Sequence, residues 1–273
     1  MLINQETMDR MHLLQLEMLR ELVRVMDILG IKYYMVHGSL LGAIRDHDFI
    51  KEDDDIDIAI FREDYNRLIV EGQSLLKSEY FLQNSVTDNF PLPFAKLRKQ
   101  KTAFIQPVLK NCNCNQGIYI DIFPIDYEGR GLVFKIKRYL MENRIAEIIS
   151  LERKRTALQR VKSVLVRLMY RSYDTTLLKR ELLYSSQKAT ETVCIYGGKT
   201  SERGMPISWF GNPIEEQFCG LKVTIPRQSA EYLRRIYGDD YFSHNPAQGR
   251  FDNKLIEISA KILDFDQSYK LYY

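Results

Sequence analysis

The chain has 273 residues, of which 45% are hydrophobic and 27% charged. This balance is typical of a globular domain and excludes wholesale disorder. No run of eighteen apolar residues occurs, which excludes a spanning helix, and the first ten residues lack the basic and apolar regions of a signal peptide. Four cysteines, two of them at positions 112 and 114, are too few and too cramped for a disulfide framework. We therefore expect a soluble, cytoplasmic protein.

In chain order, hydrophobic periodicity and turn residues predict alternating helices and strands. The predicted helices cover 7–29, ended by Gly30, then 40–45, 64–77 with Asp64 as the N-cap, and 229–236. The predicted strands cover 31–36, 56–61, 95–98, 103–107, 118–123, closed by Pro124, and 221–225, closed by Pro226. This mixture predicts an α/β or α+β fold, a mixed sheet flanked by helices.

The net charge of +3 conceals a strongly basic segment. Residues 130–180 contain fourteen Lys or Arg and four acids, so the rest of the chain sums to −7. Within it, an apolar stripe of Leu158, Val161, Leu165 and Leu168 has helical spacing. We therefore divide the chain into a catalytic core over 1–129, a basic helical insertion over 130–185, and a segment over 186–273 that completes the core and the acceptor side.

A glycine and a serine, Gly38 and Ser39, lie where a predicted strand gives way to a helix. Free backbone N–H groups at such a junction favour a phosphate, and glycine allows the phosphate to approach the backbone closely. Most Gly-Ser junctions are plain turns, so phosphate binding at this pair is supported only by the acidic residues that follow it.

Those residues are the run Asp53-Asp54-Asp55-Ile56-Asp57, which leads into a predicted strand. Alternation places Asp55 and Asp57 on one face, and two adjacent carboxylates need a compensating cation. Asp121 lies in the middle of another apolar strand and supplies a third oxygen ligand. Oxygen donors of this kind suit Mg²⁺, with Mn²⁺ as a second candidate.

Simpler interpretations stay open beside this metal site. Most aspartate runs are acidic surface loops, and the face that carries Asp121 can point to water. The four cysteines offer a zinc site, although the C-x-C spacing does not match the usual zinc knuckle. No Ser-His-Asp or Cys-His arrangement for nucleophilic catalysis is visible.

The motifs together resemble the LicD family and its eukaryotic relatives of the fukutin type. The resemblance runs from Tyr34 to Tyr241 and rests on H-G-S-L-L-G-A-I-R, D-D-D-I-D-I, A-K-L-R, I-D-I-F-P-I-D, F-G-N-P and L-R-R-I-Y-G-D-D-Y. It implies a nucleotidyltransferase fold and a phosphotransferase. Family members move a phospho-alcohol such as phosphocholine from CDP-choline or another CDP-alcohol to a sugar of a surface glycan.

The resemblance also implies roles for individual residues. Gly38 and Ser39 match the positions that hold the donor pyrophosphate, and Asp55 and Asp57 match the positions that bind Mg²⁺. Asp121 matches the third carboxylate, as ligand or base. Arg45 matches the family's arginine after the short helix.

Two further cations, Lys96 and Arg98, join Arg45 as groups that neutralise the departing CMP. A solvated strand edge is the alternative for Lys96 and Arg98. The quaternary ammonium of choline would suit aromatic faces, for which Trp209, Phe210, Tyr237 and Tyr241 are candidates, although such residues more often belong to a core.

The sequence departs from the family pattern at two places. Lys51-Glu52 stand where the family commonly has Pro-Trp, and the segment 130–180 carries no motif that matches. For this segment we expect contact with an anionic membrane, near a lipid-linked acceptor, with a solvated basic face as the plain alternative. No nucleic-acid-binding motif appears, so nucleic acid is not an expected partner.

Two other functions compete with a phospho-alcohol transferase. A true nucleotidyltransferase would move the nucleoside monophosphate and release pyrophosphate rather than CMP. A non-catalytic nucleotide-binding or membrane-binding module would keep the fold without turnover. The three aspartates argue against the module, because such a cluster is costly to keep without a function.

Overall fold

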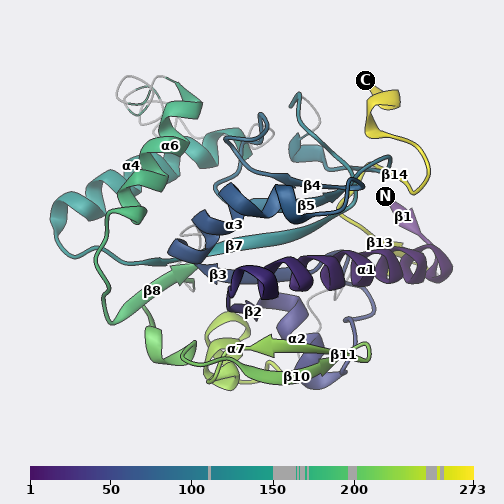
Figure 1. Ribbon diagram of the computed structural model, residues 1–273, viewed down its shortest axis with the longest axis horizontal. Coiled ribbons are helices and arrows are strands. Elements are labelled where there is room, and N and C mark those ends of the chain that lie inside the picture. Colours follow the sequence, from purple (N-terminus) through teal and green to yellow (C-terminus); the bar gives the residue numbers. More distant parts are fainter. Residues whose placement is uncertain are drawn as a thin grey trace.

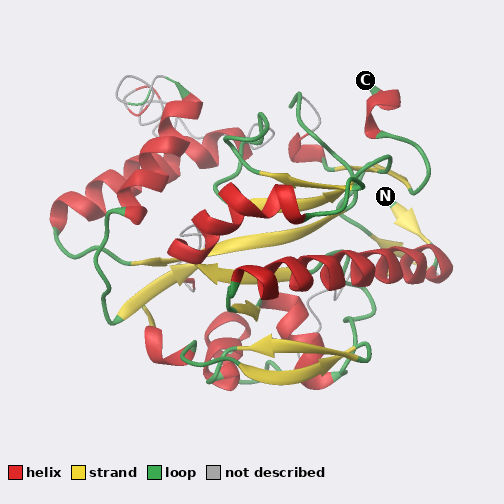
Figure 2. Ribbon diagram, viewed as in Figure 1, coloured by secondary structure: helices red, strands yellow, loops and turns green. Residues whose placement is uncertain are grey.

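The computed structural model describes residues 1–109, 112–149, 164, 166, 170, 172–195, 202–243, 251–252 and 255–273. Its centre is a mixed sheet in the order β2-β3-β7-β5-β4, with β8 and β9 continuing from β7 (Figures 1 and 2). These strands are β2 (Tyr33–Met35), β3 (Asp57–Phe61), β4 (Tyr80–Gln83), β5 (Ala95–Lys99), β7 (Tyr119–Tyr127), β8 (Thr192–Ile195) and β9 (Met205–Pro206). The predicted α+β fold with a mixed sheet is confirmed.

One neighbouring pair in this sheet, β3 and β7, is parallel, and the other pairs are antiparallel. Strand β3 and most of β7 are buried, because Ile58, Ile60, Ile120 and Ile122 belong to the hydrophobic core. The two strands thus form a rigid base in the middle of the sheet.

Pro124 does not close its strand, contrary to the prediction, and β7 continues to Tyr127. Strand β5 pairs with residues 119–122 of β7, whereas β8 pairs with residues 125–127. Pro124 lies between these two ladders. On the edge of β7 that faces β5 and β8, no strand pairs with residue 124, so the missing N–H of proline costs no hydrogen bond there. The exchange of partners therefore makes the proline acceptable.

Two long helices pack against the sheet, α1 (Gln5–Leu29) and α3 (Arg62–Leu75). The side chain of Asn4 accepts the N–H of Thr7 at the start of α1, and Gly30 ends the helix at φ 64°, as predicted. Asp64 is not the N-cap of α3. The cap is Phe61, without a side-chain hydrogen bond, and Asp64 lies in the first turn, where a carboxylate still favours the helix dipole.

Helix α2 (His37–Arg45) packs on β3 and on the C-terminal part of the chain. That part contributes a hairpin of β10 (Ile214–Phe218) and β11 (Leu221–Ile225), followed by α7 (Ser229–Tyr237). The predicted strand over 221–225 and the predicted helix after it are confirmed, whereas β10 and β4 carry no prediction.

Short strands and 3₁₀ turns bring the two ends of the chain close together (Figure 1). β1 (Leu2–Ile3) pairs with β13 (Leu255–Glu257), which pairs with β12 (Phe251–Asp252). β14 (Ile262–Asp264) pairs with β6 (Ala103–Ile105). The 3₁₀ turns cover Pro107–Leu109, Ile207–Trp209 and Tyr269–Tyr272.

Helices α4 (Leu132–Ile149) and α6 (Tyr173–Ser185) lie side by side at the opposite end of the molecule (Figure 1). The predicted stripe of Leu158, Val161, Leu165 and Leu168 falls outside the described residues. Of the helices that the structure describes, none has the length and apolar character needed to cross a bilayer.

Candidate active site

The register of the parallel pair brings two of the predicted aspartates together. Asp57 opens β3 and lies opposite Asp121 of β7, so both side chains leave the same face of the sheet. Asp55 precedes Asp57 by two residues and extends the same face. Carboxylate oxygens of Asp55, Asp57 and Asp121 all lie within 4.8 Å of one another.

Burial and mutual repulsion make this group of carboxylates electrostatically unfavourable. Burial first, and then the charges of Asp57 and Asp53, raise the pKa of Asp55 well above its usual range. Burial also raises the pKa of Asp121 to about 6, although the charge of Lys96 acts in the opposite direction. The cluster therefore favours a cation or a proton.

A lysine lies within the cluster. Lys96 of β5 is the register partner of Asp121, and its Nζ lies 2.6 Å from Asp121 Oδ1. The same Nζ lies 3.3 Å from the centroid of the Tyr119 ring, and the Tyr119 hydroxyl donates to Asp55 Oδ2 at 3.4 Å. Burial lowers the pKa of Lys96 against the attraction of Asp121. One ammonium group does not neutralise three carboxylates.

This donor set fits a divalent cation. Three carboxylates that converge from β3, the loop just before it and β7, with excess negative charge, supply the oxygen ligands that Mg²⁺ prefers. Asp55, Asp57 and Asp121 are therefore the residues that would hold the ion. Asp121 does not face water, because its side chain is buried, and the aspartate run is not a plain surface loop, because Asp54 is buried and Asp57 belongs to β3.

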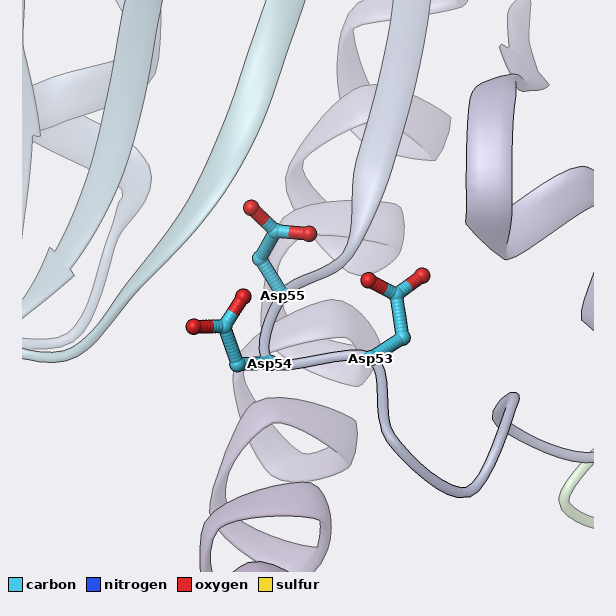
Figure 3. A group of neighbouring side chains, drawn as sticks. All are labelled: Asp53, Asp54 and Asp55. Atoms are coloured by element: carbon cyan, nitrogen blue, oxygen red, sulfur yellow. The ribbon is translucent and has the colours of Figure 1, made fainter. Parts of the chain in front are cut away.

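Asp53 and Asp54, the neighbours of Asp55 in the loop before β3, lie on either side of Asp55 (Figure 3). Asp54 is buried, and one of its carboxylate oxygens accepts the backbone N–H of Ser259. Its backbone carbonyl accepts from the amide of Gln15. Asp54 thus links the loop to α1 and to the C-terminal segment. Oxygens of Asp53, Asp54 and Asp55 also lie within 4.8 Å of one another and form a second group of potential metal ligands.

The start of α2 lies directly beside the acidic cluster. The backbone N–H of Asp57 donates to Ser39 Oγ at 2.8 Å, which fixes the junction between helix and strand. A Cβ on Gly38 would stand 2.1 Å from Asp53 Oδ2, so glycine is needed for the close approach of a carboxylate. The predicted phosphate position at Gly38 and Ser39 is therefore next to Asp53, and its role stays a prediction.

His37 connects the cluster to a distant part of the chain. It occupies the left-handed region, with φ 49°. Its Nδ1 lies 3.5 Å from Asp57 Oδ2, and its Nε2 lies 3.6 Å from Glu202 Oε1. Burial alone would lower the pKa of His37, but Asp57 and Glu202 raise it to about 9. Residue 37 therefore orders the turn, as its position before Gly38 suggests, and also positions Asp57.

The other predicted cations lie in different surroundings. Arg45 is in the last turn of α2, about 10 Å along the axis from Gly38, and pairs with Asp46. Arg98 is fully buried; it donates to Gln83 Oε1 and to the Gly117 carbonyl oxygen. A solvated strand edge is the wrong description of Lys96 and Arg98, because β5 is flanked by β4 and β7. Donor binding by Arg45, Lys96 and Arg98 stays a prediction.

The candidate aromatic residues separate into core and site. Phe210 is fully buried against Tyr34, Phe61 and Tyr232. Tyr237, at the end of α7, lies near enough to the cluster for Asp57 and Asp53 to add to the effect of burial in raising its pKa. Trp209 and Tyr241 are half-buried against the core.

The alternative of a zinc site on the cysteines finds no support among the described residues. Cys112, Cys114, Cys194 and Cys219 are free thiols. None of them belongs to a group of potential metal ligands in the part of the chain that the structure describes.

Residues 30–149 match the LicD/FKTN/FKRP nucleotidyltransferase domain, and this range includes all three clustered aspartates, Gly38, Ser39 and Lys96. The chain carries a LicD-family domain. No curated protein matches the chain significantly. The resemblance drawn over Tyr34–Tyr241 is thus confirmed for the part up to residue 149, and this match suggests a phosphotransferase of the LicD/FKTN kind.

Sequence reasoning missed three residues of this LicD-type site. The position of Tyr119 could have been predicted, because it precedes Asp121 by two residues and strand alternation places both side chains on one face. Asp53 was noticed only as part of an acidic run. Glu202 carried no signal, since it comes from a distant segment and reaches His37 only in the folded chain.

Proposed function

We propose that this LicD-type protein transfers a phospho-alcohol, phosphocholine first among the candidates, from a CDP-linked donor to a sugar of a cell-surface glycan precursor. The observation that supports it is the set of three convergent carboxylates on β3 and β7 beside the start of α2. A site that concentrates negative charge next to the N-terminal end of a helix is suited to a cation and a pyrophosphate together.

In the proposed reaction the acceptor oxygen forms a bond to the phosphorus of the phospho-alcohol, and the bond from that phosphorus to the CMP oxygen breaks. Mg²⁺ or Mn²⁺, when bound, would neutralise charge on the pyrophosphate. The Asp121 carboxylate accepts the proton of the acceptor hydroxyl, and the charge of Lys96 favours its ionised form. CMP departs with the electron pair of the broken bond.

The cations and the aromatic residue have separate roles in this scheme. Lys96 keeps Asp121 in place through the 2.6 Å contact and reduces the repulsion between the carboxylates. Ser39 fixes the backbone of Asp57, so that the ligand carboxylate stays in register with Asp121. Tyr237, whose pKa the charges of Asp57 and Asp53 help to raise, is the aromatic residue proposed to contact a quaternary ammonium group.

The test is a calorimetric titration of the purified protein with CDP-choline, CDP-ribitol and CTP, each with and without Mg²⁺. Metal-dependent binding of one CDP-alcohol in preference to CTP supports the proposal and names the alcohol. Product analysis with an acceptor then distinguishes the reactions: CMP supports phospho-alcohol transfer, whereas pyrophosphate released from CTP would show a nucleotidyltransferase. Failure of every nucleotide to bind would contradict both.

A further inference from the structure

Helices α4 and α6 present apolar side chains to solvent as well as to the core. Leu132, Val133, Ile136 and Tyr139 of α4 are between 48% and 72% exposed, and Leu178 and Leu182 of α6 are likewise exposed. Together with Val164, these make up seven of the eighteen exposed large hydrophobic residues in the described parts of the chain. Such a concentration marks an interaction surface rather than scattered surface residues.

The exposed residues form stripes opposite the faces that anchor the helices. With 3.6 residues per turn, Leu132, Ile136 and Tyr139 lie about half a turn from the buried Phe134 and Met141. Helix α4 therefore has two apolar faces, one packed and one exposed.

On α6, Leu178 and Leu182 are separated by four residues and share one side. The buried residues Leu177, Arg180 and Tyr184 take the other side. Tyr184 packs edge to face on Phe134 of α4, with ring centroids 5.5 Å apart, so the two helices form one unit.

Among the residues of α4 and α6 whose side chains the structure describes, the exposed charges are positive. Lys135, Lys137 and Lys179 are exposed. Of the acids whose side chains the structure describes here, Glu142 pairs with Arg203, and Glu181 is half-buried beside Ser85. The outward side therefore combines apolar side chains with positive charge.

We infer that the outward side of α4 and α6 binds the surface of an anionic lipid bilayer. Apolar stripes flanked by lysines match the boundary between acyl chains and negatively charged headgroups. Residues 150–171, which join the two helices, add seven Lys or Arg against one acid, so the charge of the neighbouring sequence is complementary to the same surface. This binding is independent of the reaction proposed above.

The test is flotation of the whole protein with vesicles of phosphatidylcholine alone and of phosphatidylcholine mixed with phosphatidylglycerol. The protein should float with the mixed vesicles at low salt and remain behind with the neutral ones. Raising the salt should weaken binding, because exposed charges are screened within about 8 Å at physiological ionic strength.

Two pairs of variants locate the surface. Leu132→Ser with Ile136→Ser should lower the partition coefficient on mixed vesicles about tenfold or more, since two apolar side chains no longer enter the bilayer. The matched control is Leu13→Ser with Val70→Ser, which are equally exposed residues on α1 and α3. Lys135→Glu with Lys137→Glu should also abolish binding, whereas the exposed pair Lys261→Glu with Lys270→Glu should not.

Circular dichroism and denaturation midpoints confirm that each variant is folded. The inference is overturned if the wild-type protein does not float with anionic vesicles at low salt. It is equally overturned if the Leu132/Ile136 variant and its Leu13/Val70 control lose binding to the same extent. A third contradictory result is a wild-type dimer that the Leu132/Ile136 variant converts to a monomer in light scattering, because the stripe would then be a contact between two copies.

Discussion

Buried charges are arranged differently at the two ends of the β3–β7 pair. At the beginning of β3, Asp55, Asp57 and Asp121 crowd together, and the cations within ion-pair distance are Lys96 and His37, which Glu202 shares. At the end of β3, Arg62 faces Asp126 of the same strand β7.

The second group is a saturated ion pair. Arg62 Nε lies 2.6 Å from Asp126 Oδ1, and Arg62 Nη2 lies 2.9 Å from Asp126 Oδ2, with both side chains buried. Such bidentate geometry matches each charge with an opposite one. The comparison shows that burial alone does not identify a functional charge; the informative feature is a surplus of one sign. Four predictions test this contrast, from the largest effect to the smallest.

Breaking the saturated pair should cost the most stability. Arg62→Met leaves Asp126 buried without its partner, and we expect the free energy of unfolding to fall by about 3–5 kcal/mol. Urea denaturation measures this fall. The exposed pair Lys222–Glu215 is the control, since Lys222→Met should cost less than about 1 kcal/mol. A similar small loss for Arg62→Met would show that the buried pair is not structural.

Removing a carboxylate at the other end should affect activity instead. Asp57→Asn should lower kcat about a hundredfold or more, equivalent to about 2.7 kcal/mol, because a ligand charge is lost while the shape is kept. The measurement is CMP release with the donor identified by titration. Circular dichroism should show a folded variant, and a fully active Asp57→Asn protein would contradict the metal assignment.

Metal should stabilise the protein through the same carboxylates. Mg²⁺ at about a hundred times its Kd should raise the free energy of unfolding of the wild type by about 2.7 kcal/mol. Asp57→Asn should lose most of this gain, whereas the exposed Glu63→Gln should retain it. Urea denaturation with Mg²⁺ or with a chelator provides the comparison, and equal gains in all three proteins would place the ion elsewhere.

Without metal, relief of the repulsion between carboxylates should slightly raise the free energy of unfolding. In the presence of a chelator, Asp55→Asn should be about 1 kcal/mol more stable than the wild type, because burial and its neighbours disfavour the charge of Asp55. Denaturation midpoints measure it. A loss of stability instead would mean that Asp55 makes a structural contact that the amide cannot replace.

Much of the fold was predictable because its signals are local. Helix α1, with its glycine cap, and strands β3, β5 and β11 follow from periodicity and from turn residues within a few positions of each end. Two predictions failed at the ends of elements. Pro124 lies inside β7 because of an exchange of partner strands, and Asp64 is not the cap of α3. The division at 129 and 185 stays a prediction, although β8, from the last part, joins β7.

The sequence by itself determined the chemistry that the site offers: three aspartates, a Gly-Ser junction and a lysine in strands with recognisable alternation. It also determined the charge contrast between residues 130–180 and the rest of the chain. Only the tertiary structure decided which groups meet, namely that Asp57 and Asp121 share a register, that Lys96 neutralises one carboxylate, and that Glu202 reaches His37. The reason is physical: composition and period are properties of neighbours along the chain, whereas repulsion, desolvation and ion pairing depend on distances that only folding sets.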